Sequence, residues 1–479
     1  MTGLATAAPS EVGFDARGVL RFLDGVDALG LELHGLSIAR HGRLLADAAW
    51  APYSPTDLNL LYSVSKSFTS FALGIALRDH DIDLDARVVD LLPSVVPPST
   101  ALADLTVGDV ARMATGHDGD SLPEMIRRRR ETGADLVQSF FDIAPVRAPG
   151  TTFVYDNGAT VVLAAVIRTV TGGSLVELLG RDVLRTLGVD EFFWRSFAPG
   201  EEEAFSGLHL RTRDLAAFGD LVLRDGYRGE EQLVAPRWAA LAGSALTSTV
   251  DPTHSADWEV GYGLQFWVSR HGFRADGAYG QFVLILPEQD LVVVITSASR
   301  GEQPAQILDL AWQHLLPACD APIDSNADAA LADRLAALLH PPLRSEATHT
   351  PALGAEAPVD VTGPAPFSAV AVSAGDPHPV VTLHFADGDV AALPVGEGTW
   401  VSGSLAGHKG PVEFSSSGGW SEDGAYRARL RMIRTPHALT VRIGLEGASI
   451  AWDDPMIYGD DPRAYGVQPV RLSDPPTDG

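Results

Sequence analysis

The sequence contains one cysteine, two lysines and no long apolar run. Cys319 alone cannot form an internal disulfide or build a cysteine-based zinc site, so we expect no metal and no cofactor. No apolar stretch reaches the roughly 18 residues that a membrane-spanning helix needs. Residues 1–11 have neither the basic nor the apolar region of a secretory signal. We therefore expect a cytoplasmic protein with no membrane partner.

Positive charge is also scarce. The 35 Lys and Arg residues are outnumbered by 62 Asp and Glu residues, which gives a net charge of −27. A field of this sign repels phosphate backbones and anionic lipids, so nucleic acid is not an expected partner. The basic run 127–130 is interpreted as the solvated face of a helix.

The order of apolar patterns predicts an α/β (α+β) fold. Residues 14–29 have helical spacing, and 36–49 read as a β-hairpin. Residues 62–187 are mostly helical, strand patterns return over 262–297, and 306–316 reads as a closing helix. An antiparallel sheet split by a helical insert follows from this order.

The length of 479 residues suits two or three domains. We place the first domain at 1–318. An Ala- and Pro-rich linker with one short helix follows at 319–364, and a small antiparallel β-domain, for which a lipocalin-like form is one reading, spans 365–479.

Because the chain has only two lysines, Lys66 is a candidate functional residue. Arginine stays protonated near neutral pH, whereas burial lowers the pKa of a lysine until it can act as a base. Ser63 lies three residues before Lys66, and on a helix this spacing places the hydroxyl and the amine on one face. The pair is suggestive of a nucleophile and its base, although a Ser-rich helix start with a solvated lysine is the plain alternative.

The segment 149–157, Pro-Gly-Thr-Thr-Phe-Val-Tyr-Asp-Asn, adds a Tyr-x-Asn element, Tyr155 and Asn157, before an apolar helix. With the Ser63-x-x-Lys66 element, the chain resembles the penicillin-recognising serine hydrolases over about residues 10–318. These include class C β-lactamases and family VIII esterases. The resemblance implies a β-lactamase/transpeptidase-like fold and an acyl-enzyme on Ser63.

The third element departs from that family. Ala275-Asp276-Gly277 stands where Lys-Thr-Gly is expected, so the residues that help to bind a substrate carboxylate are missing. Penicillins and D-Ala-D-Ala peptides are therefore not the expected substrates, and the form resembles 6-aminohexanoate-dimer hydrolases and related esterases. Ala278, after Gly277, matches the position that supplies a backbone N–H to the oxyanion.

The resemblance assigns roles to the remaining candidates. Tyr155 would carry protons to the leaving group, Asn157 would orient Lys66, and the backbone N–H groups of Ser63 and Ala278 would bind the oxyanion. Which residue is the resting base stays open. Substrate contacts are expected from Gly277, Asp276, Tyr279 and His117, although a core position is the commoner use of such a histidine.

Three functions remain open at this point. The leading hypothesis is a serine hydrolase that cleaves an ester or amide of a small molecule or short peptide. A second is an acyltransferase or peptide cyclase that resembles penicillin-binding-protein-type thioesterases, since water and amine compete for one acyl-enzyme. A third is a non-catalytic ligand-binding homologue. The sequence does not decide whether the protein forms a homo-oligomer.

Overall fold

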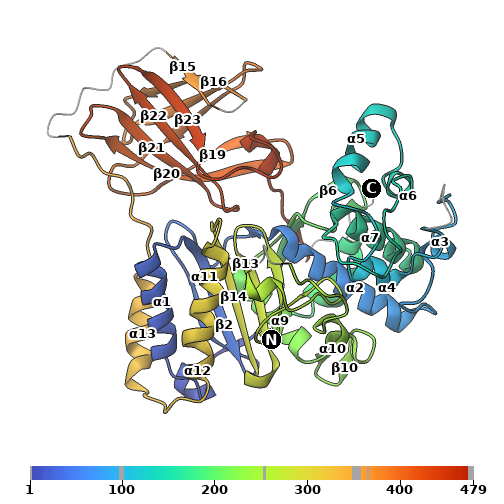
Figure 1. Ribbon diagram of the computed structural model, residues 1–479. Helices are drawn as coiled ribbons and strands as arrows, with labels where there is room; N and C mark the ends of the chain where they lie inside the picture. Colours follow the sequence, from blue (N-terminus) through green and yellow to red (C-terminus); the bar gives the residue numbers. More distant parts are fainter. Residues whose placement is uncertain (1–2, 97–101, 252–254, 348–357, 364–365, 473–479) are drawn as a thin grey trace. The chain divides into compact units, whose positions relative to one another are not determined.

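The computed structural model describes residues 3–96, 102–251, 255–347, 358–363 and 366–472. It divides into two units, each described by itself below (Figure 1). The first comprises residues 1–48, 61–336 and 470–479, and the second comprises 49–60 and 337–469. The predicted boundaries at 318 and 365 differ from this division, because helix α13 (Asn326–Ala336) contacts α1 (Arg17–Leu29) within the first unit. Residues 348–357 and 364–365 of the predicted linker region lie outside the described residues.

A seven-stranded sheet forms the first unit's framework, in the order β1-β3-β2-β14-β13-β12-β11. Its strands are β1 (Ala5–Thr6), β2 (Leu33–Arg40), β3 (Arg43–Ala49), β11 (Trp267–Val268), β12 (Phe273–Gly277), β13 (Gln281–Leu286) and β14 (Leu291–Ser297). The antiparallel pairing of β2 with β14, with Ala39 opposite Val292, joins the strands that precede the helical insert to those that follow it. The predicted split sheet is thus confirmed.

The strand predicted over 262–269 is shorter than expected. Only β11 is extended there, because Gly261 has φ 146° and Gln265 has φ 60°, which interrupt the β conformation. On the sheet, α9 (Thr212–Leu223) packs against β13, β14 and β2. A Cβ at Gly219 of α9 would come within 2.5 Å of the Val292 side chain, so the close approach requires glycine.

Helices α1 and α11 (Gln303–Leu310) lie on the near side of the sheet in Figure 1. The insert consists of α2 (Ser65–Asp79), α3 (Val88–Leu91), α4 (Val107–Ala111), α5 (Leu122–Thr132), α6 (Leu136–Phe141), α7 (Asn157–Thr171) and α8 (Leu175–Leu179). Helix α2 is buried from Ser65 to Ala76 and contacts α7. The carboxylate of Asp156 caps α7 by accepting the Gly158 N–H, and Gly172, at φ 73°, ends the helix. The packing of α2 on α7 brings the two sequence elements together.

The first unit contains further short elements. They are β5 (Glu191–Trp194), β6 (Ser196–Ala198), β7 (Glu201–Glu202), β8 (Leu208–Leu210), β9 (Tyr227–Arg228), β10 (Glu231–Gln232), α10 (Trp238–Ala242), α12 (Leu316–Ala318) and β24 (Val470–Arg471). Strand β24 pairs with β5, so the chain returns to the first unit after the second. Within the described residues, no single helix is long and apolar enough to cross a bilayer, and only the bent pair Asn157–Thr171 and Leu175–Leu184 passes that test together.

The second unit is a nine-stranded sheet in the order β18-β17-β16-β15-β23-β22-β21-β20-β19. Its strands are β15 (Val359–Thr362), β16 (Phe367–Ser373), β17 (Val380–Phe385), β18 (Val390–Pro394), β19 (Val401–Gly407), β20 (Gly410–Trp420), β21 (Tyr426–Met432), β22 (Ala438–Gly444) and β23 (Gly447–Trp452). All neighbours are antiparallel except β15 and β23, and the outer strands β18 and β19 contact each other. The predicted β-domain is confirmed as a near-barrel.

Candidate active site

Ser63 lies in a tight turn directly before the central helix. The turn η2 (Tyr62–Val64) is a 3₁₀ turn and α2 begins at Ser65, whereas the sequence pattern placed Ser63 within the helix. Tyr62 has φ 48°, a left-handed conformation that is uncommon for a bulky residue. Backbone strain of this kind clusters at functional turns. Lys66 lies in the first turn of α2, and its amine still reaches the Ser63 hydroxyl, 3.0 Å away.

The Lys66 amine is held by three oxygen atoms. Its Nζ lies 3.0 Å from Ser63 Oγ, 2.7 Å from Asn157 Oδ1 and 2.9 Å from the carbonyl oxygen of Phe205. Lys66 is 1 % exposed. Burial lowers its pKa from 10.5 to about 7, against the charges of Asp120, Asp156 and Asp276, which raise it. An amine with this pKa is substantially neutral near pH 7.

Tyr155 contacts both Ser63 and Lys66. Its phenol is hydrogen-bonded to Ser63, and its ring centroid is 4.8 Å from Lys66 Nζ. The ring stacks on Trp267 at 6.0 Å with an interplanar angle of 18°. Burial raises the pKa of Tyr155, outweighing the hydrogen bond to Ser63, which lowers it. The phenol is therefore protonated wherever the lysine is half neutral.

Asn157 is oriented by Asp120, a residue that sequence reasoning missed. Asp120 Oδ2 accepts the Asn157 Nδ2–H at 2.6 Å, and Oδ1 accepts its backbone N–H at 2.9 Å. With the amide nitrogen fixed on the carboxylate, the amide oxygen points to Lys66. No spacing signal links the two residues, because they are 37 positions apart in the sequence.

His117 does not reach the site surface. It is 1 % exposed, its Nδ1 lies 3.1 Å from Thr115 Oγ1, and its Nε2 lies 3.1 Å from the carbonyl oxygen of Ile143. Its Nδ1 is also 3.5 Å from the buried carboxylate of Asp156. Both ring nitrogens are therefore engaged within the protein, and a substrate contact by His117 stays a prediction.

Gly277 brings the end of β12 against the turn that contains Ser63. A Cβ at Gly277 would lie 2.3 Å from the Leu61 carbonyl oxygen and 3.3 Å from the Val64 nitrogen. Only glycine permits this approach, and it puts the backbone of Ala278 next in the chain at the turn. The Tyr279 ring, whose residue has φ 65°, lies 5.2 Å from the Tyr62 ring.

Asp276 precedes this glycine and is held by a buried arginine. Its Oδ2 accepts the Arg274 Nε–H at 2.9 Å, and the Asp276 side chain is 12 % exposed. Burial raises the pKa of Asp276, and the adjacent Arg274 lowers it. The Arg274 guanidinium is 0 % exposed and lies 4.4 Å from the Trp258 ring centroid. The arginine therefore offers a substrate no accessible positive charge.

No three His, Cys, Asp or Glu side chains gather into a possible metal site anywhere in the portion of the chain that the structure describes. The chemistry available around Ser63 is that of a hydroxyl between a buried amine and a phenol. On a split sheet with a helical insert, this arrangement defines a serine hydrolase of the β-lactamase and penicillin-binding-protein class.

Comparison with known proteins identifies the family of the chain. Residues 28–316 match the beta-lactamase family, and the chain belongs to it. It is 26 % identical over 284 residues to 6-aminohexanoate-dimer hydrolase of Paenarthrobacter ureafaciens, covering 54 % of this chain and 71 % of that protein. It is also similar to a Bacillus anthracis structure assigned by its name to the 6-aminohexanoate-dimer hydrolases, with TM-score 0.54, 19 % identity, and coverage of 63 % and 82 %.

One further similarity extends over both units. The octameric penicillin-binding protein homologue from Pyrococcus abyssi matches with TM-score 0.51 and 14 % identity, and the match covers 91 % of this chain and 99 % of that one. At this identity the likeness concerns the fold. The protein is thus a β-lactamase-fold serine hydrolase.

Proposed function

We propose that the protein cleaves an ester or amide bond through an acyl-Ser63 intermediate, with Lys66 as the base and Tyr155 as the acid. The partner set of Lys66 Nζ supports this most. Two of its three partners are carbonyl oxygens, which only accept hydrogen bonds, and the third is a hydroxyl. A neutral amine has two N–H donors for the two carbonyl oxygens, and in the proposed mechanism its lone pair takes the proton of the Ser63 hydroxyl, 3.0 Å away.

Acylation begins with attack of Ser63 Oγ on the substrate carbonyl, while its proton moves to the lone pair of Lys66. The negative charge on the former carbonyl oxygen is bound by the backbone N–H groups of Ser63 and Ala278, which the contact of Gly277 with the turn brings near each other. Tyr155 then donates its proton to the leaving group and recovers one from the Lys66 ammonium.

Deacylation uses the same proton-transfer groups, with water as the attacking molecule. Water loses a proton through Tyr155 to the neutral Lys66 as its oxygen attacks the acyl carbonyl, and Ser63 Oγ takes that proton when the ester bond breaks. Asn157, fixed by Asp120, keeps the amine directed at the serine throughout. Each group ends in its starting protonation state.

The negatively charged side chains near Ser63 disfavour a substrate that carries a carboxylate close to its acyl group. Asp120 and Asp276 both raise the pKa of Lys66, so their negative charges act at the nucleophile. The Lys66 amine is occupied by protein oxygens, and Arg274 is buried. We therefore propose a neutral ester or amide as the substrate class.

Replacement of the nucleophile tests the proposal. Ser63→Ala is expected to lower the hydrolysis of p-nitrophenyl butanoate at least about a thousandfold and to abolish labelling by a fluorophosphonate. The matched control is Ser70→Ala, one to two turns further along α2, whose hydroxyl donates to the Leu264 carbonyl instead. Labelling that survives in the Ser63 variant would disprove the acyl-serine.

Assays with other substrates show whether water or an amine accepts the acyl group and which substrate class is preferred. A peptidyl thioester separates hydrolysis from cyclisation, because both share the acyl-enzyme and differ only in whether water or an amine attacks it. A linear acid is the expected product, and a cyclic product would contradict the choice of water. Nitrocefin and a carboxylate-bearing ester are expected to react more slowly than the neutral ester.

A further inference from the structure

The segment 203–207, between β7 and β8, carries one of the three oxygen atoms that hold the Lys66 amine. This atom is the Phe205 carbonyl oxygen, 2.9 Å from Lys66 Nζ. The backbone on either side of Phe205 is left-handed, with φ 58° at Ala204 and 86° at Gly207. An alanine keeps this conformation where its surroundings impose it. The contacts around the segment therefore decide where the Phe205 carbonyl points.

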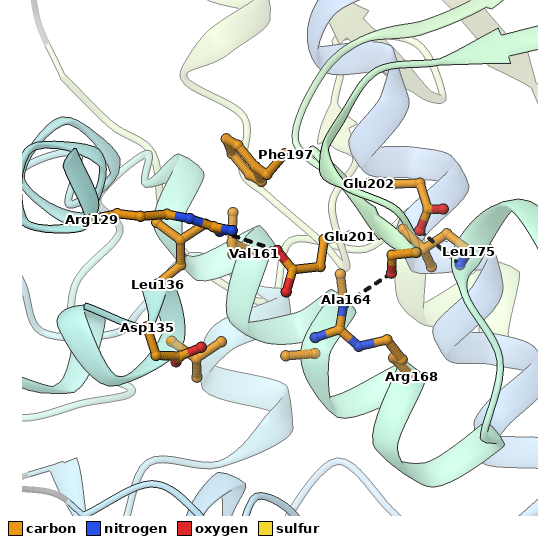
Figure 2. Close-up of a pocket in the computed structure, with 13 residues that line it drawn as sticks. Arg129, Asp135, Leu136, Val161, Ala164, Arg168, Leu175, Phe197, Glu201 and Glu202 are labelled. Atoms are coloured by element: carbon orange, nitrogen blue, oxygen red, sulfur yellow. Dashed lines mark hydrogen bonds and ion pairs between the residues drawn. The ribbon is translucent and has the colours of Figure 1, made fainter. Parts of the chain in front are cut away.

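Both ends of the segment are anchored to neighbouring elements. Before it, Glu201 of β7 accepts the Arg129 Nη1–H at 3.1 Å, and Glu202 accepts the Leu175 N–H at 3.1 Å (Figure 2). After it, β8 pairs with β5. These anchors lie outside residues 203–207, so they do not by themselves set the direction of a carbonyl within the segment.

Thr69 binds the carbonyl group directly before that of Phe205. Its Oγ1 donates to the Ala204 carbonyl oxygen at 2.9 Å, and the side chain is 0 % exposed. A threonine within a helix often donates to the carbonyl four residues back, but here the Ser65 carbonyl oxygen is 3.4 Å away, so the shorter contact goes to the segment. Because Thr69 follows Lys66 by three positions on α2, the two side chains share a face of the helix and bind consecutive carbonyl groups.

We propose that Thr69 is a positioning residue for the reaction: by holding the Ala204 carbonyl, its hydroxyl keeps the next carbonyl, that of Phe205, against the Lys66 amine. This inference rests on the proposed role of Lys66 as the base. The peptide plane between Ala204 and Phe205 is rigid, so once it is fixed only the two dihedrals at Phe205 direct the next carbonyl. Without the Thr69 hydroxyl, the buried Ala204 carbonyl would lose its donor, and the segment would turn to satisfy it elsewhere.

The Phe205 carbonyl affects both the direction and the protonation of the amine. A carbonyl oxygen binds an ammonium roughly twice as strongly as a neutral amine, so loss of this acceptor favours the neutral form. Four other titratable groups act on Lys66, each with a partner outside the segment 203–207. They are Tyr155 with Ser63, Asp120 with Asn157, Asp156 with Ser121, and Asp276 with Arg274. Replacement of Thr69 leaves these pairs in place, so a change in the Lys66 titration would report on the Phe205 carbonyl.

The ionisation of Lys66 tests this proposal without any turnover. The chain has only two lysines, Lys66 and Lys409, so protein labelled with ¹³C at the lysine Cε gives two resonances, and Lys66→Met assigns them. Thr69→Val replaces the hydroxyl by a methyl group of similar size and is expected to lower the pKa of Lys66 by about 0.5 to 1. In ester hydrolysis it is expected to lower kcat by about tenfold with little change in KM, because the amine loses its direction. Thr69→Ser keeps the hydroxyl and should titrate as the wild type does.

Thr160→Val is the matched control. It removes an equally buried hydroxyl, on α7, that donates to the Gln265 side chain at 2.8 Å, and the Lys66 titration should stay in place. Thr69→Ala removes the same hydroxyl as Thr69→Val and provides the measurement if the valine variant does not fold. An unchanged Lys66 titration in these Thr69 variants, or an equal shift in Thr69→Ser, would overturn the proposal. If the wild type forms no acyl-Ser63, the proposed function fails, whereas the titration still decides whether Thr69 holds the acceptor of Lys66.

Discussion

Replacement of Asp120 by asparagine should move the pH dependence of catalysis toward acid. Lys66 has a pKa of about 7, so about half of it is neutral at pH 7, whereas an unperturbed amine of pKa 10.5 would be neutral in only about one molecule in 3,000. The lowering of the Lys66 pKa from 10.5 to about 7 corresponds to a free-energy shift of about 5 kcal/mol toward the neutral amine. As pH falls through 7 the amine gains a proton and kcat/KM should decline.

The expected size of the change in the Lys66 pKa follows from the hydrogen bonds that connect Asp120 to Lys66 through Asn157. The carboxylate and the amine are joined through one amide by contacts of 2.6 Å and 2.7 Å. A unit charge at about 7 Å in an effective dielectric of about 20 to 40 changes a pKa by about one unit. Asp120 favours the protonated amine, so Asp120→Asn should lower the apparent pKa from about 7 to about 6.

The assay is kcat/KM for a neutral p-nitrophenyl ester measured from acid to alkaline pH. Asp118→Asn is the matched control: it removes the same charge two positions away, where Asp118 is 71 % exposed and paired with Arg147 at 3.0 Å. Its acid limb should stay in place. An acid limb that moves upward in the Asp120 variant, or that is absent from the wild type, would refute the assignment of Lys66 as the base.

Two other outcomes follow from the same geometry. Lys66→Met should abolish turnover yet raise the free energy of unfolding by about 1 to 3 kcal/mol in urea denaturation, because it removes a buried amine. The folded pKa lies below the unfolded one, so this gain should be full below pH 7 and fade as pH rises toward 10.5, and a uniform loss of stability would contradict it. Gly277→Ala should lower kcat/KM at least about a hundredfold, because its Cβ would meet the Leu61 carbonyl oxygen at 2.3 Å. Gly173→Ala, where the nearest atom is 3.5 Å away, should not, and equal activity of both variants would refute the positioning role of Gly277.

The local part of the site was predictable from the sequence. The Ser63–Lys66 spacing survives the difference between a 3₁₀ turn and an α-helix, since both place residues i and i+3 on one side. The Tyr155 and Asn157 element is recognisable by its resemblance to the family's Tyr-x-Asn motif, and it stands at the start of the apolar helix α7. Short apolar runs rich in β-branched residues likewise indicated β13 and β14.

The long-range part was not predictable. The acceptor for Lys66 on Phe205 is a backbone carbonyl 139 residues away, and a carbonyl carries no sequence signal. Asp120 lies in a loop where an acidic residue is usually solvated. The Arg274–Asp276 pair needed the burial of a guanidinium between β12 and Trp258, which charge patterns along the chain do not show.

The interleaving of the two units has a consequence for how the enzyme can be taken apart. The chain leaves the first unit at Ala48, returns at Leu61, leaves again at Ala336 and returns at Val470. No single cleavage therefore releases the near-barrel, and a truncation at Ala336 would discard β24 and expose the edge of β5 with which it pairs. A catalytic fragment has to be assembled from three separate stretches, and the second of these begins two residues before Ser63.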